Sequence, residues 1–228
     1  MAASFDGGVV LGADSRTSTG NYIANRVTDK LTPLAENVYV CRSGSAADTQ
    51  NLSSYVQHFL AQHRLDLDRE VGVKTAAQLA KNLVYQNKEM LQAGLIVAGW
   101  DSEEGGSVYA VPLGGTLVKC PFAIGDVLAL VHGWPISPSV YCGGGSGSAY
   151  IYGLCDKHWK AGMSEEECKS FVKQAVSHAM ARDGSSGGCI RTVCISKDGA
   201  KRDFVPGHSV PGHYGELARP RPAGLANA

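Results

Sequence analysis

Apolar residues in the first forty positions occur mainly in short runs that are separated by turn residues. Two such runs flank a pair of glycines in Phe5–Asp14, which is the pattern of a β-hairpin. Asn37–Arg42 alternates between apolar and polar side chains and leads into a Ser-Gly-Ser turn at residues 43–45. We therefore expect this part of the chain to form strands.

From Ala46 the apolar residues recur every three or four positions, which predicts an amphipathic helix. The residues on its predicted face are Leu52, Tyr55, Val56, Phe59, Leu60 and His63. A second helix is predicted from the same spacing at Ala76, Leu79, Ala80, Leu83, Met90 and Leu91. Strands are then predicted at Gly94–Trp100, Ser107–Pro112 and Gly115–Phe122, with turns at Asp101–Gly106 and at residues 113–115.

Two further helices are predicted at Ser148–Trp159 and Ser164–Met180. The second begins with a capping box, because Ser164 is followed three residues later by Glu167. A closing hairpin is predicted from Cys189–Ser196 and Ala200–Val205, with its turn at Asp198-Gly199.

This order of elements separates blocks of strands from blocks of helices, which favours an α+β fold with antiparallel sheets over a parallel βαβ sheet. A four-layer αββα sandwich, with two sheets between helix pairs, would cover both apolar faces of each sheet. We expect one domain over residues 1–205. The tail at 206–228 is rich in Pro and Gly at its start, and we expect it to be disordered alone or to lie across a partner.

The 228 residues carry 21 basic and 21 acidic side chains, so the net charge gives no reason to expect nucleic acid or an anionic membrane as a partner. Only 18% of the residues are charged, which suggests that other chains cover part of the surface. The longest apolar stretches are too short to span a bilayer, and no secretory signal is recognisable. Seven scattered cysteines without a C-x-x-C pair predict buried thiols in a reducing, intracellular compartment and no zinc site.

Two glycine-rich segments could carry chemistry. Gly184–Gly188 matches the G-x-S-x-G pattern around Ser186, but that nucleophile elbow needs a strand before it and a helix after it, and here the order is reversed. A serine hydrolase is therefore only a remote alternative. Cys142–Ser148 opens a helix, as phosphate-binding loops do, but it lacks their glycine and lysine pattern, so a tight turn is the more ordinary interpretation.

Asp14, Lys30 and Arg42 are charged residues in predicted strand regions with apolar neighbours. The segments that contain them form a recognisable set: Phe5–Arg16, Tyr22–Lys30, Cys41–Gln50 and Arg182–Gly188. In content and order, these four segments resemble catalytic β-type subunits of the eukaryotic 20S proteasome, over about residues 2–205. Arg42 before Ser43-Gly44 resembles the post-acidic, or caspase-like, subunit type.

The resemblance implies the fold and reaction of an N-terminal nucleophile hydrolase, in ubiquitin-dependent protein breakdown and without a metal or cofactor. In that family a threonine hydroxyl attacks the peptide carbonyl, and the threonine's own α-amino group, with an ordinary pKa of about 7.7–8.0, acts as general base. Lys30 matches the lysine that lowers the pKa of its neighbours, and Asp14 matches its paired carboxylate. Ser146, Asp183 and Ser186 match the group around the threonine amine, and the Gly44 N–H matches the oxyanion donor.

The resemblance also implies a substrate pocket and a set of partners. The residues that match the first specificity pocket are Thr17, Thr19, Thr28, Arg42 and Ala46. A guanidinium in that pocket favours a substrate Glu or Asp. The implied partners are other α- and β-type subunits in stacked seven-membered rings and unfolded polypeptide substrates, in the cytoplasm and nucleus, with no nucleic acid or membrane.

The sequence departs from the family pattern at two places. The family threonine should stand three residues before Met1, so we expect a start further upstream, with a propeptide and the threonine; the alternative is a non-catalytic ring subunit. The second departure is Asp126–Gly144, where the family runs directly from Gly125 to Gly145. We expect these residues to be translated intervening sequence, since a long structureless loop is improbable there. A real loop would displace Ser146.

Overall fold

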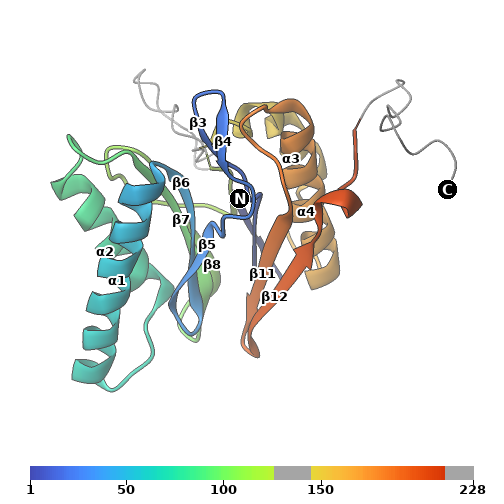
Figure 1. The fold of residues 1–228 in the computed structure, drawn as a ribbon. Helices are drawn as coiled ribbons and strands as arrows, with labels where there is room; N and C mark the ends of the chain where they lie inside the picture. The colour runs from blue at the N-terminus through green and yellow to red at the C-terminus, as the bar shows by residue number, and fades with distance from the viewer. Residues whose placement is uncertain (126–144, 214–228) are drawn as a thin grey trace, which may run out of the picture.

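Two five-stranded antiparallel sheets pack face to face in the computed structural model, which describes residues 1–125 and 145–213 (Figure 1). The first sheet has the strand order β10-β1-β2-β11-β12. Its strands are β1 (Ala2–Phe5), β2 (Gly8–Ala13), β10 (Phe122–Ala123), β11 (Ile190–Ser196) and β12 (Gly199–Val205). Both predicted hairpins, β1–β2 and β11–β12, belong to this sheet and are confirmed.

The second sheet has the order β5-β6-β7-β8-β9. Its strands are β5 (Leu31–Ala35), β6 (Val38–Gly44), β7 (Ala93–Asp101), β8 (Gly105–Val111) and β9 (Val118–Lys119). A separate two-stranded hairpin, β3 (Thr17–Thr19) with β4 (Tyr22–Asn25), connects the two sheets along the chain.

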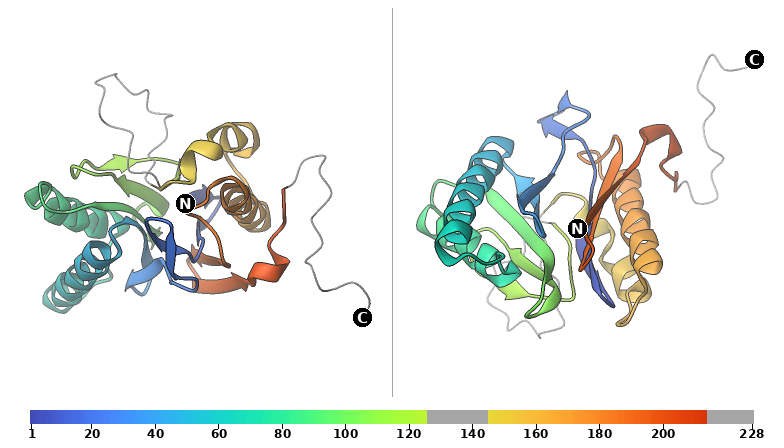
Figure 2. Two further views of the ribbon diagram at one scale, coloured as in Figure 1. Left: turned by 45° about the horizontal axis from the view of Figure 1, so that its top comes forward. Right: turned by 90° about the horizontal axis from the view of Figure 1, so that it is seen from below.

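A pair of helices covers the outer face of each sheet (Figures 1 and 2). The pair on the second sheet is α1 (Ala46–Leu67) with α2 (Val73–Gln86), and the pair on the first is α3 (Tyr152–His158) with α4 (Glu165–Arg182). Two 3-10 turns complete the described elements, η1 (Ser148–Tyr150) and η2 (Gly207–Ser209).

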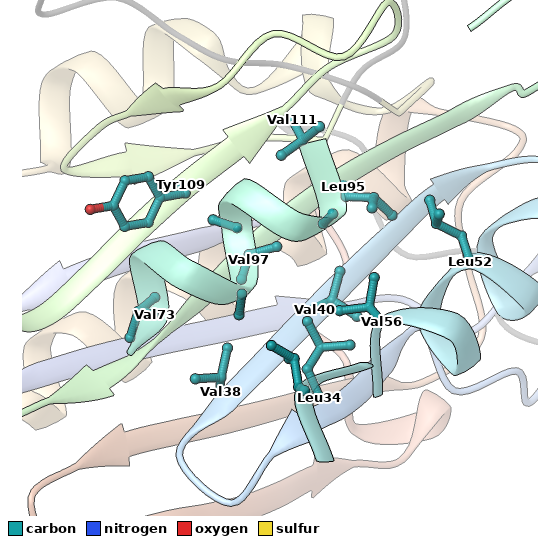
Figure 3. Close-up of a cluster of buried hydrophobic side chains, with 14 of the residues drawn as sticks. Leu34, Val38, Val40, Leu52, Val56, Val73, Leu95, Val97, Tyr109 and Val111 are labelled. Atoms are coloured by element: carbon teal, nitrogen blue, oxygen red, sulfur yellow. The ribbon is translucent and has the colours of Figure 1, made fainter. Parts of the chain in front are cut away.

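Three clusters of buried side chains separate the four layers. One joins α1 and α2 to the second sheet through residues such as Leu52, Val56 and Val97 (Figure 3). Another, which includes Leu11 and Ile195, lies between the sheets, and the last joins the first sheet to α4 through residues such as Phe171. The predicted four-layer αββα sandwich is therefore confirmed, because each sheet buries both of its faces.

Two capping arrangements explain where helices α4 and α2 begin. The predicted capping box of α4 is present, since the Glu167 N–H donates to Ser164 Oγ and the Ser164 N–H donates to Glu167 Oε2. Helix α2 has Gly72 at its N-cap, which offers no side chain, and Asp101 at the end of β7 accepts from the Val73 N–H instead. A residue distant in sequence thus replaces the local cap.

The structure differs from the predicted elements in three places. The strand predicted at Gly115–Phe122 is two short strands in different sheets, because the chain crosses between the sheets at Pro121, which has no N–H for a ladder. The helix predicted at Ser148–Trp159 is interrupted at Ile151, whose backbone leaves the helical region. The second helix ends at Gln86, so Met90 lies beyond it with 85% of its surface exposed.

The predicted insert at 126–144 lies outside the described residues, as does most of the tail from residue 214. The six cysteines within the described segments are buried and form no disulfide there. In the same segments, no helix combines the length and apolar character needed to cross a membrane.

Candidate active site

A cavity of about 250 Å³ lies where the first strands of both sheets meet the loop after α4. Met1 lines it, and Figure 2 places the amino terminus near the middle of the molecule. The predicted site residues that line this cavity are Asp14, Lys30, Gly44, Ser146 and Ser186, together with Thr17, Thr28, Arg42 and Ala46. Residues from both ends of the described chain, from Met1 to Ser186, therefore surround one space.

Lys30 and Asp14 form an ion pair in this cavity. Lys30 Nζ lies 2.6 Å from Asp14 Oδ1, and both side chains are mostly shielded from solvent. The other carboxylate oxygen, Asp14 Oδ2, accepts from the backbone N–H groups of Arg16 and Gly187 at 3.1 and 3.0 Å. Asp14 is thus held from three directions, and it in turn holds the Lys30 ammonium towards the cavity.

Ser146, Asp183 and Ser186 form a second group of hydrogen-bonded side chains. Both serine hydroxyls donate to Asp183 Oδ2, at 2.6 and 2.5 Å, and the Ser185 N–H donates to Asp183 Oδ1. Burial by itself would raise the pKa of Asp183, but these hydrogen bonds and the nearby Lys30 charge outweigh it and lower the pKa. Asp183 is therefore ionised at neutral pH and fixes the orientation of two hydroxyls.

The loop after α4 joins the two groups, because it carries Asp183 and Ser186 and also donates from Gly187 to Asp14. Arg16 strengthens this link through a hydrogen bond of 2.8 Å from Nη1 to the Gly184 carbonyl. Sequence reasoning did not single out Arg16, although its place two residues after Asp14 was a signal.

Ser186 does not have the setting of a nucleophile elbow. Its loop runs from helix α4 into strand β11, and its hydroxyl donates to a carboxylate. The other glycine-rich segment is described only from Gly145, where a side chain would overlap the Gly125 carbonyl. Gly145 therefore allows a close backbone approach, as expected for a tight turn.

Gly44 ends β6 at the cavity with φ +96°, in the region that favours glycine. A Cβ there would also overlap the Gln92 carbonyl. Both observations require glycine at this position, which brings an unobstructed stretch of backbone to the cavity wall.

Arg42 is buried in the wall of the cavity, with 8% of its surface exposed. Its guanidinium donates to three neutral oxygens: Thr32 Oγ1 at 3.0 Å, Thr49 Oγ1 at 3.4 Å and the Asp29 carbonyl at 2.6 Å. Burial lowers the pKa of Arg42. These three acceptors were not predicted, because hydroxyl and carbonyl partners leave no pattern in a sequence.

The other predicted pocket residues divide into two sets. The hydroxyls of Thr17 and Thr28 lie 2.9 Å apart at the cavity, and Ala46 lines it at the start of α1. Thr19 is at the exposed end of β3 and does not line the cavity. Of the matched pocket positions, Thr19 is therefore the one that this structure does not bring to the cavity.

This arrangement can support nucleophilic chemistry at the amino-terminal end of β1. Around one space it provides the Lys30 ammonium, the Asp14 carboxylate, the buried Arg42 guanidinium and two serine hydroxyls. The Asp183 carboxylate, which is not among the lining residues, orients these two hydroxyls. The described residues contain no cluster of three or more side chains that could hold a metal ion.

Comparisons with known proteins show the family of this chain. The model of the family described as "Proteasome subunit" matches residues 1–130 and 129–195. Proteasome subunit beta type-6 of Dictyostelium discoideum is 53% identical over 92% of this chain and 90% of its own length. The Arabidopsis thaliana protein of the same name is 51% identical, over 95% and 85%. Proteasome subunit beta type-1 of Saccharomyces cerevisiae is 46% identical, over 89% and 85%. The chain therefore belongs to the proteasome subunit family, as a β-type member.

Proposed function

We propose that this β-type proteasome subunit is a catalytic threonine endopeptidase that cleaves polypeptides after acidic residues. The observation that carries the proposal is the buried guanidinium of Arg42, which faces the same cavity as the Lys30–Asp14 pair and the Ser146–Asp183–Ser186 group. β-Type proteasome subunits form a threonine protease family, and the relatives described above support the assignment at that level.

The surroundings of Arg42 support acidic specificity. A guanidinium has five N–H donors, and here three hydrogen bonds engage it, all with neutral oxygens. Among residues 1–125 and 145–213, no carboxylate lies within 4.0 Å of its nitrogens. A buried cation without a contacting carboxylate favours an anionic substrate side chain in the cavity. The guanidinium would bind that side chain through charge-assisted hydrogen bonds.

The position of Met1 supports a nucleophile upstream of it. Met1 and Gly12 exchange two backbone hydrogen bonds, of 2.7 and 2.9 Å, so the ladder between β1 and β2 is intact at Met1. If the antiparallel register continues, the preceding residue lies opposite Ala13 and the one before it opposite Asp14. A threonine three residues upstream, about 10 Å further at strand spacing, would enter the region of Lys30 and Asp14.

In the proposed reaction, the threonine hydroxyl attacks the substrate carbonyl while its α-amino group accepts the hydroxyl proton. Lys30 stabilises the negative charge that develops, and the Gly44 N–H donates to the oxyanion. The protonated α-amino group of the threonine then returns the proton to the leaving amine as the peptide C–N bond breaks. Water hydrolyses the resulting ester and regenerates the threonine. Asp183, Ser146 and Ser186 would orient the amino group throughout.

We further propose that the subunit acts within stacked seven-membered rings of α- and β-type subunits, in the cytoplasm and nucleus, on unfolded polypeptides. The low proportion of charged residues is consistent with a surface that other subunits cover.

The test is cleavage of a fluorogenic peptide that ends in Glu, by particles assembled with the native subunit, with Lys30→Ala or with Lys157→Ala. Lys157 is an exposed lysine on α3 and provides the matched control. We expect Lys30→Ala to lower kcat by about 100-fold or more and Lys157→Ala to have no effect. Equal rates in all three particles would instead support a non-catalytic ring subunit.

A further inference from the structure

Asp29 places an acidic side chain next to the cation that would recognise acidic substrates. It lies between β4 and β5, and its carbonyl accepts from Arg42 Nη2 at 2.6 Å. The charge of its carboxylate also reaches Arg42, where it opposes the effect of burial. An uncompensated carboxylate here would weaken the attraction of Arg42 for an anionic ligand.

The Asp29 carboxylate has its own cationic partner, which is not one of the residues that line the cavity. Asp29 Oδ2 lies 2.5 Å from Nη2 of Arg202, a residue of the edge strand β12. The same Arg202 nitrogen is 3.4 Å from the Leu31 carbonyl, and Asp29 Oδ1 accepts from the Leu31 N–H at 3.0 Å. Arg202 does not line the cavity. It contacts Asp29 and Leu31, which flank the cavity residue Lys30 in the chain.

We propose that Arg202 is a specificity-determining positioning residue, which neutralises Asp29 so that the Arg42 guanidinium remains the dominant charge for an acidic substrate side chain. This inference rests on the proposed post-acidic activity. Arg202 acts through Asp29 and does not itself contact the substrate.

The two roles of Asp29 explain why a second arginine is needed. Its carbonyl helps to hold Arg42 in place, and this contact comes from the backbone, so it does not depend on the side chain. Its carboxylate shapes the chain at Leu31 through the Leu31 N–H, and this contact brings a negative charge close to the pocket. Arg202 compensates that charge without using a donor of Arg42.

The pair is accessible to substitution because both side chains are about 40% exposed. Exposed ion pairs contribute little to folding stability, so loss of Arg202 should leave the fold and the assembly intact. Its electrostatic effect on a bound anion should remain measurable, since Arg42 is buried and less screened.

The test uses assembled particles and a peptide that ends in Glu. We expect Arg202→Ala to raise KM about threefold to tenfold, the range for a partly exposed charge interaction, with kcat unchanged. Arg202→Lys should restore KM, and so should Asp29→Asn combined with Arg202→Ala. Lys173→Ala is the matched control, because it breaks a similar exposed pair with Asp203 of β12, away from the cavity.

Asp29→Asn alone should change KM in the opposite direction, and it leaves both arginines in place. It leaves Arg202 uncompensated, so KM for the Glu peptide should fall. An unchanged KM in Arg202→Ala, a failed rescue by Asp29→Asn, or a rise in KM for Asp29→Asn alone would overturn the inference. If native particles cleave after Glu and these variants behave otherwise, only the role of Arg202 fails. If native particles lack the activity, the proposed function fails first.

Discussion

Substitution of Arg42 by methionine isolates the charge on which acidic specificity would depend. Methionine has a similar length and fills the same buried space without a charge. The variant should keep the shape of the cavity, since Arg42 lies in its wall with only 8% of its surface exposed.

The expected fall in kcat/KM follows from the Arg42 N–H donors that remain available to a substrate. Two charge-assisted hydrogen bonds from Arg42 to a substrate carboxylate, at about 1.5 kcal/mol each, amount to about 3 kcal/mol. At 1.4 kcal/mol for each factor of ten, kcat/KM for a peptide that ends in Glu should fall about 100-fold.

The stability of the variant should change much less than its specificity. Removal of a buried cation relieves a desolvation penalty, whereas Thr32 Oγ1 and the Asp29 carbonyl lose a donor. These effects oppose each other, and we expect a net change in the free energy of unfolding within about 2 kcal/mol.

The assay compares cleavage of peptides that end in Glu and in Leu. Arg64→Met, at an exposed arginine of α1, is the control variant. Cleavage after Glu should fall, and cleavage after Leu should be equal or higher. Undiminished cleavage after Glu in Arg42→Met particles would refute the assignment of Arg42 as the recognition group.

Three further predictions concern stability. Gly44→Ala should lower the free energy of unfolding by about 1–3 kcal/mol because of its positive φ, and by more because the new Cβ overlaps Gln92. Gly20→Ala, with φ +59° and open surroundings, measures the effect of the positive φ alone, and urea unfolding compares the two variants. Because the pKa of Asp183 is lowered in the folded protein, its contribution is present above about pH 4 and lost as the pH falls through the native pKa. Asp183→Asn should therefore lose less stability than the native chain between pH 4 and pH 2, and an identical profile would contradict this. The stacked rings of His178 and His213, 3.5 Å apart, have pKa values lowered by burial, with Arg182 nearby, so stability should fall as the pH drops below about 6.5. His178→Phe should weaken that dependence in a series of Tm measurements.

Periodicity predicted the layers of this fold because helices α1, α2 and α4 and the longer strands are long enough to show an apolar face. The strand at 115–122 was mispredicted because a period of two cannot reveal that the chain changes sheets at Pro121. The cap of α2 was equally invisible, since Asp101 reaches Val73 from another strand.

The candidate site was predicted from the family resemblance of four segments, and the structure brings most of these residues to one cavity. The acceptors that hold Arg42 could not be predicted, since a backbone carbonyl such as that of Asp29 has no sequence signature. The same limit applies to Arg202, which approaches Asp29 through the pairing of β11 with β12.

The most direct test of the central claim is the first residue of the mature subunit, measured by intact mass and N-terminal sequencing of assembled particles. The account predicts a threonine three residues before Met1, next to the Lys30–Asp14 pair. The account would be contradicted if cleavage after Glu depends on this subunit and yet its mature chain begins at Met1 or Ala2.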